Sequence, residues 1–326
     1  MRGKKTPEIL AELERLMAPA TAGDPITGLK WTRKTTAKVS RELERRGFEA
    51  CPRTVARLLK SLEYALRVNH KKLSRGSATT RRVRNQQFRY LEQMRTTFAD
   101  AGAPVISVDS KKKELIGCFK NPGATWTRVA TPVKDHDFRS EADALAVPYG
   151  IFDTAANRGY IVVGTSHDTP AFAAGAIAHW WKKEGSLRYP HAQRLLILAD
   201  NGGSNGSLCR AWKHQLQTRL CDPFALEVTV CHYPPGASKW NPVEHRLFSY
   251  VSNNWAGEPL ASLETMLNFI RTTQTQTGLR VKAALNKTLY PTGVKPSPQE
   301  MKTLNLAPHQ LLPKWNYTLA PRDANM

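Results

Sequence analysis

The sequence contains no apolar run that approaches the roughly 18 residues needed to cross a membrane. Its first residues, MRGKKTPEIL, lack the apolar stretch of a secretory signal peptide. Its five cysteines are scattered and form no C-x-x-C pair, which argues against a disulfide framework and against a structural zinc site. These absences predict an intracellular protein of the reducing cytoplasm, without a membrane partner.

Acidic residues are scarce relative to basic ones. The 326 residues include 48 Lys and Arg against 27 Asp and Glu, which gives a formal net charge of +21. A protein this basic usually binds a polyanion, and nucleic acid is the commonest one. Ribosomal or membrane-surface binding is the alternative that charge alone leaves open. The hydrophobic content of 41% is sufficient for a core. The length is sufficient for two domains, or for one large domain with an appendage.

Residues 35–66, TTAKVSRELERRGFEACPRTVARLLKSLEYAL, have the pattern of two helices joined by a short turn. Apolar residues recur at helical spacing in both halves, Gly47 interrupts them, and Pro52 starts the second helix. A short turn with Gly between two helices is typical of a helix-turn-helix, and a helical hairpin with a solvated basic face is the alternative. The side chains that would contact DNA phosphates and base edges are Arg53, Thr54, Arg57 and Lys60.

From residue 105 onward the pattern changes to alternating strands and helices. The apolar runs VISVD (105–109) and RLLILAD (194–200) are expected strands, and the second is apolar enough to be buried on both faces. A hairpin is expected at 149–168, and helices follow at 169–185 and 207–220. This alternation predicts a mixed α/β sheet with helices packed on its faces.

Three carboxylates stand where that sheet would bring them together. Asp109 ends the first strand and Asp200 ends the central one. Glu244 lies just inside a helix, for which Asn241 is a suitable N-cap and Pro242 a suitable first residue. Neighbouring strand ends open on one edge of a sheet, and a helix start can lie over that edge. Taken singly, each acid has a plainer interpretation as a turn residue, a cap or a partner of the helix dipole.

Three carboxylates in one small volume repel one another strongly unless cations neutralise them. Oxygen ligands in an open site favour Mg²⁺ or Mn²⁺. Two such ions about 3.5–4 Å apart can activate a nucleophile and stabilise the leaving oxygen of a phosphoryl transfer. The pattern therefore predicts a site for two metal ions at Asp109, Asp200 and Glu244.

The block HYPPGASKWNPVEHRLFSYV, residues 232–251, is similar to the proline-rich turn and N-P-x-E helix of bacterial insertion-sequence transposases. Together with VDSKKKELIGCFKNPG, ILADNGGSNGS, TGLRVKAAL and WNYTLAPR, it makes the chain resemble the ISAzo-type group of DDE transposases from about Trp31 to Arg322. The resemblance implies a ribonuclease H-like catalytic domain, and its catalytic triad matches Asp109, Asp200 and Glu244.

The resemblance also implies a reaction. Such an enzyme uses two Mg²⁺ or Mn²⁺ ions to cut double-stranded DNA at the element's terminal repeats and joins the freed 3′-hydroxyl to target DNA. It works as a homodimer or larger assembly on DNA, in the bacterial cytoplasm with the nucleoid. One alternative is a transposase-derived DNA-binding protein that no longer cuts, and the three intact acids argue against it. The other is a ribonuclease H-type nuclease, which the helix-turn-helix disfavours.

The expected domains are an all-α helix-turn-helix region (1–75), a basic helical connector (76–100), a ribonuclease H-like catalytic domain (101–285) and a C-terminal extension packed on it (286–326). Near the acids, further DNA contacts are expected from Lys111, Lys112, Lys113, Lys239 and Arg246. For the three consecutive lysines, a solvated run of charge is the alternative interpretation.

Other polar or aromatic residues near the expected site have plainer roles. Asn201 and Asn205 could orient water or phosphate, or serve only in a turn. His232 is expected to be a packed, satisfied histidine, and Trp240 to pack against the start of the helix. Asp168 precedes Thr169-Pro170, so capping of the next helix explains it.

Overall fold

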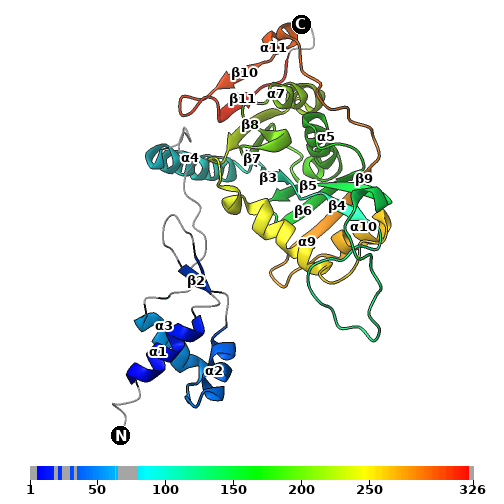
Figure 1. The fold of residues 1–326 in the computed structure, drawn as a ribbon. Coiled ribbons are helices and arrows are strands. Elements are labelled where there is room, and N and C mark those ends of the chain that lie inside the picture. The colour runs from blue at the N-terminus through cyan, green and yellow to red at the C-terminus, as the bar shows by residue number, and fades with distance from the viewer. Residues whose placement is uncertain are drawn as a thin grey trace. The chain divides into compact units, whose positions relative to one another are not determined.

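The computed structural model describes residues 6–17, 21–23, 30–32, 35–62, 64 and 80–322. The chain divides into two compact units, Met1–Gly76 and Ser77–Met326 (Figure 1). Within the described residues, no helix is both long and apolar enough to cross a membrane.

The first unit has the expected helical core, but it is not all-α, because it also contains a short antiparallel strand pair. Its described elements are α1 (Thr6–Met17), β1 (Thr21–Gly23), β2 (Lys30–Thr32), α2 (Thr36–Arg45) and α3 (Pro52–Ser61). Thr35 caps α2 by accepting a hydrogen bond from the backbone N–H of Lys38 at 3.2 Å. Gly47, with φ of +82°, makes the turn between α2 and α3 in a conformation that favours glycine. The three helices pack against one another through their apolar faces, which contain Leu13, Leu16, Val39, Leu43, Val55 and Leu58.

The second unit is built on a nine-stranded mixed sheet of order β10-β11-β8-β7-β3-β5-β6-β9, with β4 paired to β5. Its strands are β3 (Val105–Ser110), β4 (Glu114–Ile116), β5 (Ala144–Asp153), β6 (Arg158–Gly164), β7 (Arg194–Ala199), β8 (Glu227–His232), β9 (Arg280–Asn286), β10 (Leu306–Pro308) and β11 (Asn316–Leu319). β3 is parallel to β7 and antiparallel to β5, and β7 is parallel to β8. This mixed sheet with flanking helices confirms the ribonuclease H-like class expected from the sequence.

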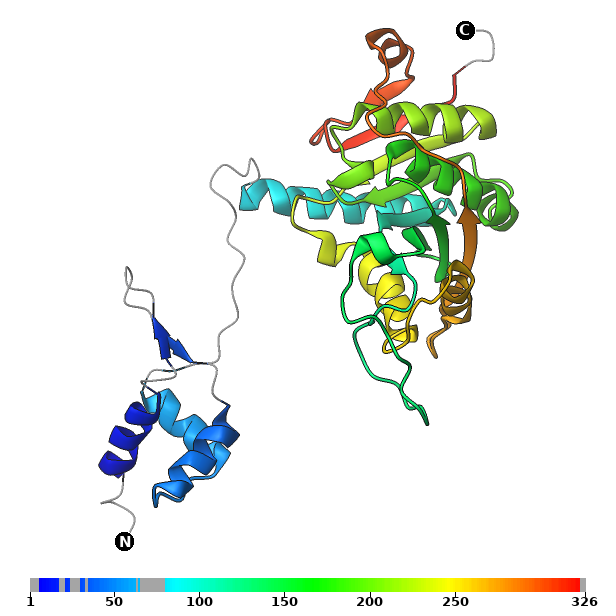
Figure 2. The ribbon, with the colours of Figure 1, turned by 45° about the vertical axis from the view of Figure 1, so that its right-hand side comes forward.

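Helices cover both faces of the sheet (Figures 1 and 2). One face carries α5 (Pro170–Trp180) and α7 (Arg210–Leu216), and the other carries α4 (Arg81–Asp100), α9 (Ser249–Asn254) and α10 (Leu263–Thr272). Along β7, Leu195 and Ile197 join the core beneath α5, whereas Leu196 and Leu198 pack toward α4. The continuous apolar run of β7 is therefore buried on both sides, as its sequence predicts.

Short helical segments complete the second unit. They are η2 (Arg139–Glu141), η3 (Trp181–Gly185), α6 (Ser186–Arg188), η4 (Gly203–Asn205), η5 (Gln217–Cys221), α8 (Asp222–Phe224), η6 (Ser238–Trp240), η7 (Glu244–Phe248) and α11 (Pro298–Lys302).

Two segments differ from their expected descriptions. Residues 81–100, part of the expected basic helical connector, do form a helix, α4, but this helix packs on the sheet of the second unit and belongs to that unit. Residues 306–319, expected in an extension on the catalytic domain, contribute β10 and β11 to the sheet itself, and β11 pairs with β8. The short strands and the frequent prolines of this segment hide a strand pattern whose partner lies far away in the sequence.

Candidate active site and DNA-binding surfaces

The sheet brings Asp109 and Asp200 to neighbouring positions. The parallel register of β3 and β7 pairs Val108 with Ala199, so the next residues along the two chains are the two acids. Side chains at equivalent positions of adjacent strands point to the same side of a sheet. Asp109 is 9% exposed and accepts a hydrogen bond from the backbone N–H of Ser110 at 2.7 Å.

Glu244 is the first residue of η7, a π-helical segment packed against β5. The close approach of η7 depends on Gly150, which pairs with Asp109 in the sheet. A Cβ at Gly150 would lie 2.3 Å from the ring of Phe248 on η7. The absence of a side chain at this position is what lets the helix that bears Glu244 lie against the strand.

Asn241 and Ser107 join the start of this helix to β3. The amide nitrogen of Asn241 donates to the carbonyl of Val108 at 3.1 Å, and its amide oxygen accepts from the Ser107 hydroxyl. The same hydroxyl accepts from the backbone N–H of Val243 at 2.9 Å. Asn241 stands directly before Pro242, the first helical residue, as the sequence predicts. Its side chain does not cap the helix, however: it is fully buried and bonds to the strand, and the Ser107 hydroxyl accepts from the helix start in its place.

His232 is hydrogen-bonded to the backbone of Asp200. The buried imidazole donates from Nδ1 to the backbone carbonyl of Asp200 at 2.8 Å. Burial lowers the pKa of His232 to about 4, so the ring is neutral near pH 7. On the other side, the backbone N–H of Gly202 donates to the Asp200 carboxylate at 3.2 Å. His232 is packed and hydrogen-bonded, as expected, and its partner is Asp200, one of the three acids that the sequence singled out.

The three carboxylates repel one another. Burial, followed by the charges of Asp200 and Glu244, raises the pKa of Asp109 to about 8. Burial also raises the pKa of Asp200, and the charges of Glu244 and Asp168 add to this effect. The acids that the sequence singled out therefore lie close enough to act on one another. Across the described residues, however, no group of three or more His, Cys, Asp or Glu side chains is arranged to hold a metal ion as it stands.

Asp168 is a fourth carboxylate of this region. It accepts a hydrogen bond from the Ser110 hydroxyl at 2.9 Å, one residue after Asp109. The cap of α5 is Thr169, whose side chain accepts from the backbone N–H of Phe172, so the expectation that Asp168 caps this helix is wrong. The sequence held one signal: Thr169 before Pro170 already supplies a cap, which leaves the adjacent Asp without that role.

The side chains of the neighbouring asparagines are hydrogen-bonded within the protein. Asn205 is buried and accepts from the hydroxyl of Tyr149 at 3.0 Å. The side chain of Asn201 accepts from the backbone and the hydroxyl of Ser207. The Asn201 contact fits the turn role that the sequence left open beside a role in orienting phosphate, whereas the Asn205 contact joins its loop to strand β5.

The basic residues expected to contact DNA near the acids differ in their surroundings. Lys111 is 11% exposed, donates to Glu114 at 2.5 Å and lies 4.8 Å from the ring centroid of Trp255, so its charge is already paired. Lys112 and Lys113 are exposed. The exposed Lys239 and Arg246 lie over the rings of Trp240 and Phe152, respectively.

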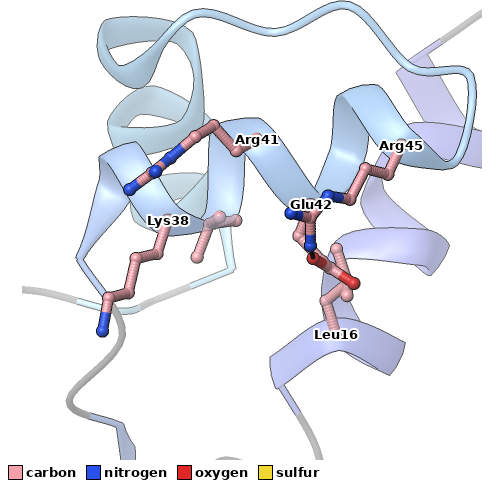
Figure 3. A pocket seen from close by; sticks show the side chains of 6 residues that line it. Leu16, Lys38, Arg41, Glu42 and Arg45 are labelled. Carbon is pink, nitrogen blue, oxygen red and sulfur yellow. Dashed lines mark hydrogen bonds and ion pairs between the residues drawn. The ribbon is translucent and has the colours of Figure 1, made fainter.

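In the first unit, Arg53, Arg57 and Lys60 are exposed along α3, and Thr54 is half-buried beside them. A basic face on α2 adds to them and was not anticipated. It borders a hollow of about 300 Å³ lined by Leu16, Lys38, Val39, Arg41, Glu42 and Arg45 (Figure 3). Arg45 is paired with Glu42 at 3.1 Å.

Comparison with known proteins places the chain in a family. No curated protein sequence matches it. Solved structures similar to it include the Mos1 transposase paired-end complex with the left transposon end (14% identity, 80% of this chain and 69% of that chain, TM-score 0.42) and the Mos1 strand transfer complex (15% identity, 80% and 68%, TM-score 0.43). The mariner Mos1 paired-end complex with Mg is similar to the same degree (14%, 80% and 69%, TM-score 0.42). The model of the Rhodopirellula transposase DDE domain matches residues 12–321, and the chain therefore belongs to this family of DDE transposases, metal-dependent enzymes of DNA cleavage and strand transfer.

Proposed function

We propose that Asp109, Asp200 and Glu244 are the catalytic carboxylates of this transposase. The observation behind the proposal is the mutual repulsion of the three acids, which, after burial, raises the pKa of Asp109 to about 8. A protein gains nothing in stability from buried carboxylates that repel one another, so their arrangement points to a cationic ligand.

The donor set fits two Mg²⁺ or Mn²⁺ ions. All three side chains offer oxygen ligands, which these hard cations prefer over nitrogen or sulfur. Binding of such cations would offset the repulsion that Asp109 experiences from Asp200 and Glu244. When bound, a pair of ions supplies activation of the attacking oxygen and stabilisation of the leaving oxygen.

Other side chains of the chain position these carboxylates. Ser107 and Asn241 tie the start of η7 to β3, and so fix Glu244 relative to Asp109. His232 restrains the backbone at Asp200. Such supporting hydrogen bonds keep catalytic groups within the narrow geometry that an in-line displacement requires.

The substrate we propose is double-stranded DNA, first the terminal repeats of an insertion sequence and then a target site. In the first step, water attacks a phosphodiester and the bond from phosphorus to the 3′-oxygen breaks. In the second, the freed 3′-hydroxyl attacks a target phosphodiester, so that one phosphorus–oxygen bond forms as another breaks. Neither step needs a covalent enzyme intermediate.

The exposed face of α3 is proposed to read the terminal repeats through Arg53, Thr54, Arg57 and Lys60. Residues 1–75 would then form the end-recognition domain, and residues 101–285, with α4 and the C-terminal strands, the catalytic domain. Joining two element ends to one target requires that both ends be held together, so a dimer or larger assembly in the bacterial cytoplasm is part of the proposal.

Strand cleavage tests this function. The substrate is a duplex that carries the terminal sequence flanking the gene, incubated with Mg²⁺ or Mn²⁺ and with the parent or Glu244→Gln. Metal-dependent nicking by the parent, lost in the variant, supports the proposal. Tight binding without nicking by the parent would favour a DNA-binding descendant that no longer cuts, and equal nicking by both proteins would remove Glu244 from the site.

A further inference from the structure

Two cations lie over one aromatic ring in the segment directly before the helix that bears Glu244. The group consists of Arg84 on α4 and of Lys239 and Trp240 on η6, and we call it the Trp240 cluster. The guanidinium carbon of Arg84 is 5.1 Å from the ring centroid of Trp240, and Nζ of Lys239 is 4.2 Å from it. Arg84 also donates to the carbonyl of Pro235 at 3.0 Å. Phe88 packs edge-on against Trp240, with centroids 5.6 Å apart.

The cations of this cluster lack an anion. Over the ranges that the structure describes, no carboxylate lies within ion-pair distance of Arg84 or Lys239, whereas Arg95 on the same helix is paired with Glu92. Two cations held at one ring repel each other, and an anion between or beside them would relieve that repulsion. The aromatic ring restrains their side chains, so little conformational entropy would be lost on binding.

The start of α4 is also rich in positive charge and lacks negative charge. Arg81, Arg82 and Arg84 all lie in or near its first turn, which contains no acidic residue. The N-terminus of a helix carries partial positive charge, so basic residues there destabilise the free helix. Arg81 and Arg82 are exposed and extend the positive surface of the cluster along α4.

The cluster is fixed relative to the three acids. Trp240 is followed directly by Asn241, whose side chain is anchored to β3, and Glu244 begins η7 three residues later. Trp240 is 45% exposed, so a ligand can reach the cluster from solvent. The distance between cluster and acids is therefore set by the hydrogen bonds that also position Glu244.

We propose that the Trp240 cluster binds the phosphate backbone of the DNA strand on which Asp109, Asp200 and Glu244 act. The choice of DNA as the anion rests on the proposed function. The cluster holds the backbone next to the carboxylates, so that a phosphodiester lies at the acids while its neighbours are bound by Arg84 and Lys239. Trp240 acts as a positioning residue for both cations.

The test measures binding of a fluorescent duplex by the full chain, without divalent ions, over a series of salt concentrations. For Arg84→Ala/Lys239→Ala, the slope of log affinity against log salt is expected to be shallower than that of the parent by about 1 to 2, because each phosphate contact contributes about 0.9. A slope equal to that of the parent, in a variant with the same thermal unfolding, overturns the proposal.

Charge reversal supplies a matched control. Lys239 is exposed, so Lys239→Glu leaves the core intact, and it is expected to weaken binding more than Lys239→Ala does. Lys302→Glu makes the same change on α11, at an exposed position of a helix that packs against α7 on the opposite face of the sheet from α4. Equal weakening of DNA binding by the two charge reversals would mean that only the overall charge matters, and would overturn the proposal.

The outcome is separable from that of the proposed function, because binding is measured without cleavage. If the slope changes but the parent never nicks DNA, the cluster binds DNA and the proposed function fails. If the parent nicks DNA and the salt slope of the double variant equals that of the parent, the proposed function stands and the proposed role of the Trp240 cluster is overturned.

Discussion

Ser107 and Asn241 are hydrogen-bonded to each other in the interior of the second unit, although 134 residues separate them in the sequence. Through this contact the strand that bears Asp109 and the helix that bears Glu244 are joined directly. The relative positions of two proposed catalytic acids therefore depend on two uncharged side chains.

Replacement of Asn241 by Leu is expected to impair both stability and cleavage. The variant leaves the Ser107 hydroxyl and the Val108 carbonyl without their partner in a buried place, which costs about 1–3 kcal/mol. Urea unfolding gives the loss of stability, and nicking of duplex DNA below the unfolding transition gives the loss of activity. A folded Asn241→Leu that nicks at the parent's rate would show that this contact does not position Glu244.

His232 makes stability depend on pH. Its pKa is about 4 in the folded protein and about 6.5 in the unfolded chain. Between these values the unfolded chain binds more protons, so the free energy of unfolding falls as the pH falls from 6.5 to 4, by about 3 kcal/mol in all. His232→Asn removes this titration and should flatten the pH dependence of thermal unfolding over that range. An unchanged dependence would show that other groups cause it.

Asp168 is expected to strengthen metal binding without being one of the three essential acids. Asp168→Asn can still accept the hydrogen bond from Ser110, but it removes a negative charge that acts on Asp200. The Mn²⁺ concentration for half-maximal nicking should rise about tenfold, in line with other residues that support metal ligands, while nicking at saturating Mn²⁺ changes little. An unaltered Mn²⁺ requirement would exclude Asp168 from this role.

The helix α3 is expected to serve recognition of the DNA ends and not chemistry. Arg53→Ala/Arg57→Ala removes two exposed cations and should reduce the preference for the terminal sequence over unrelated DNA, with metal binding unchanged. Competition binding with the two duplexes measures the preference. Glu49→Ala, an exposed position in the same unit, is the control. Loss of metal binding in the arginine variant would contradict the division of roles between the two units.

The sequence points to the three proposed catalytic acids more readily than to the residues that hold them. Asp109 and Asp200 are recognisable because each ends an apolar strand, and the order of the sheet then brings those strands side by side. Ser107, Asn241 and His232 take their roles from contacts across the fold, which no local pattern encodes. The pairing of Lys111 with Glu114 is equally hidden, because three consecutive lysines look alike until the strand β4 folds back on β5.

The strands of the sheet likewise differ in how far the local sequence predicts them. The strand β7 is predictable from its unbroken apolar run. The strand β11 has only four residues, and it is recognisable as a strand only from its pairing with β8. The helix α4 is predictable as a helix, but its buried Gln87, which bonds to Asn316 and to the carbonyl of His232, belongs to an arrangement set by tertiary contacts.

The central claim is that Asp109, Asp200 and Glu244 bind the divalent ions of a phosphoryl transfer. Electron paramagnetic resonance can count the Mn²⁺ ions bound to the full chain in the presence of duplex DNA, for the parent and for Asp200→Asn. The account predicts two ions for the parent and a clear loss in the variant, with DNA affinity equal or higher because one repulsive charge is gone. The same number of ions on both proteins, at the same affinity, would contradict it.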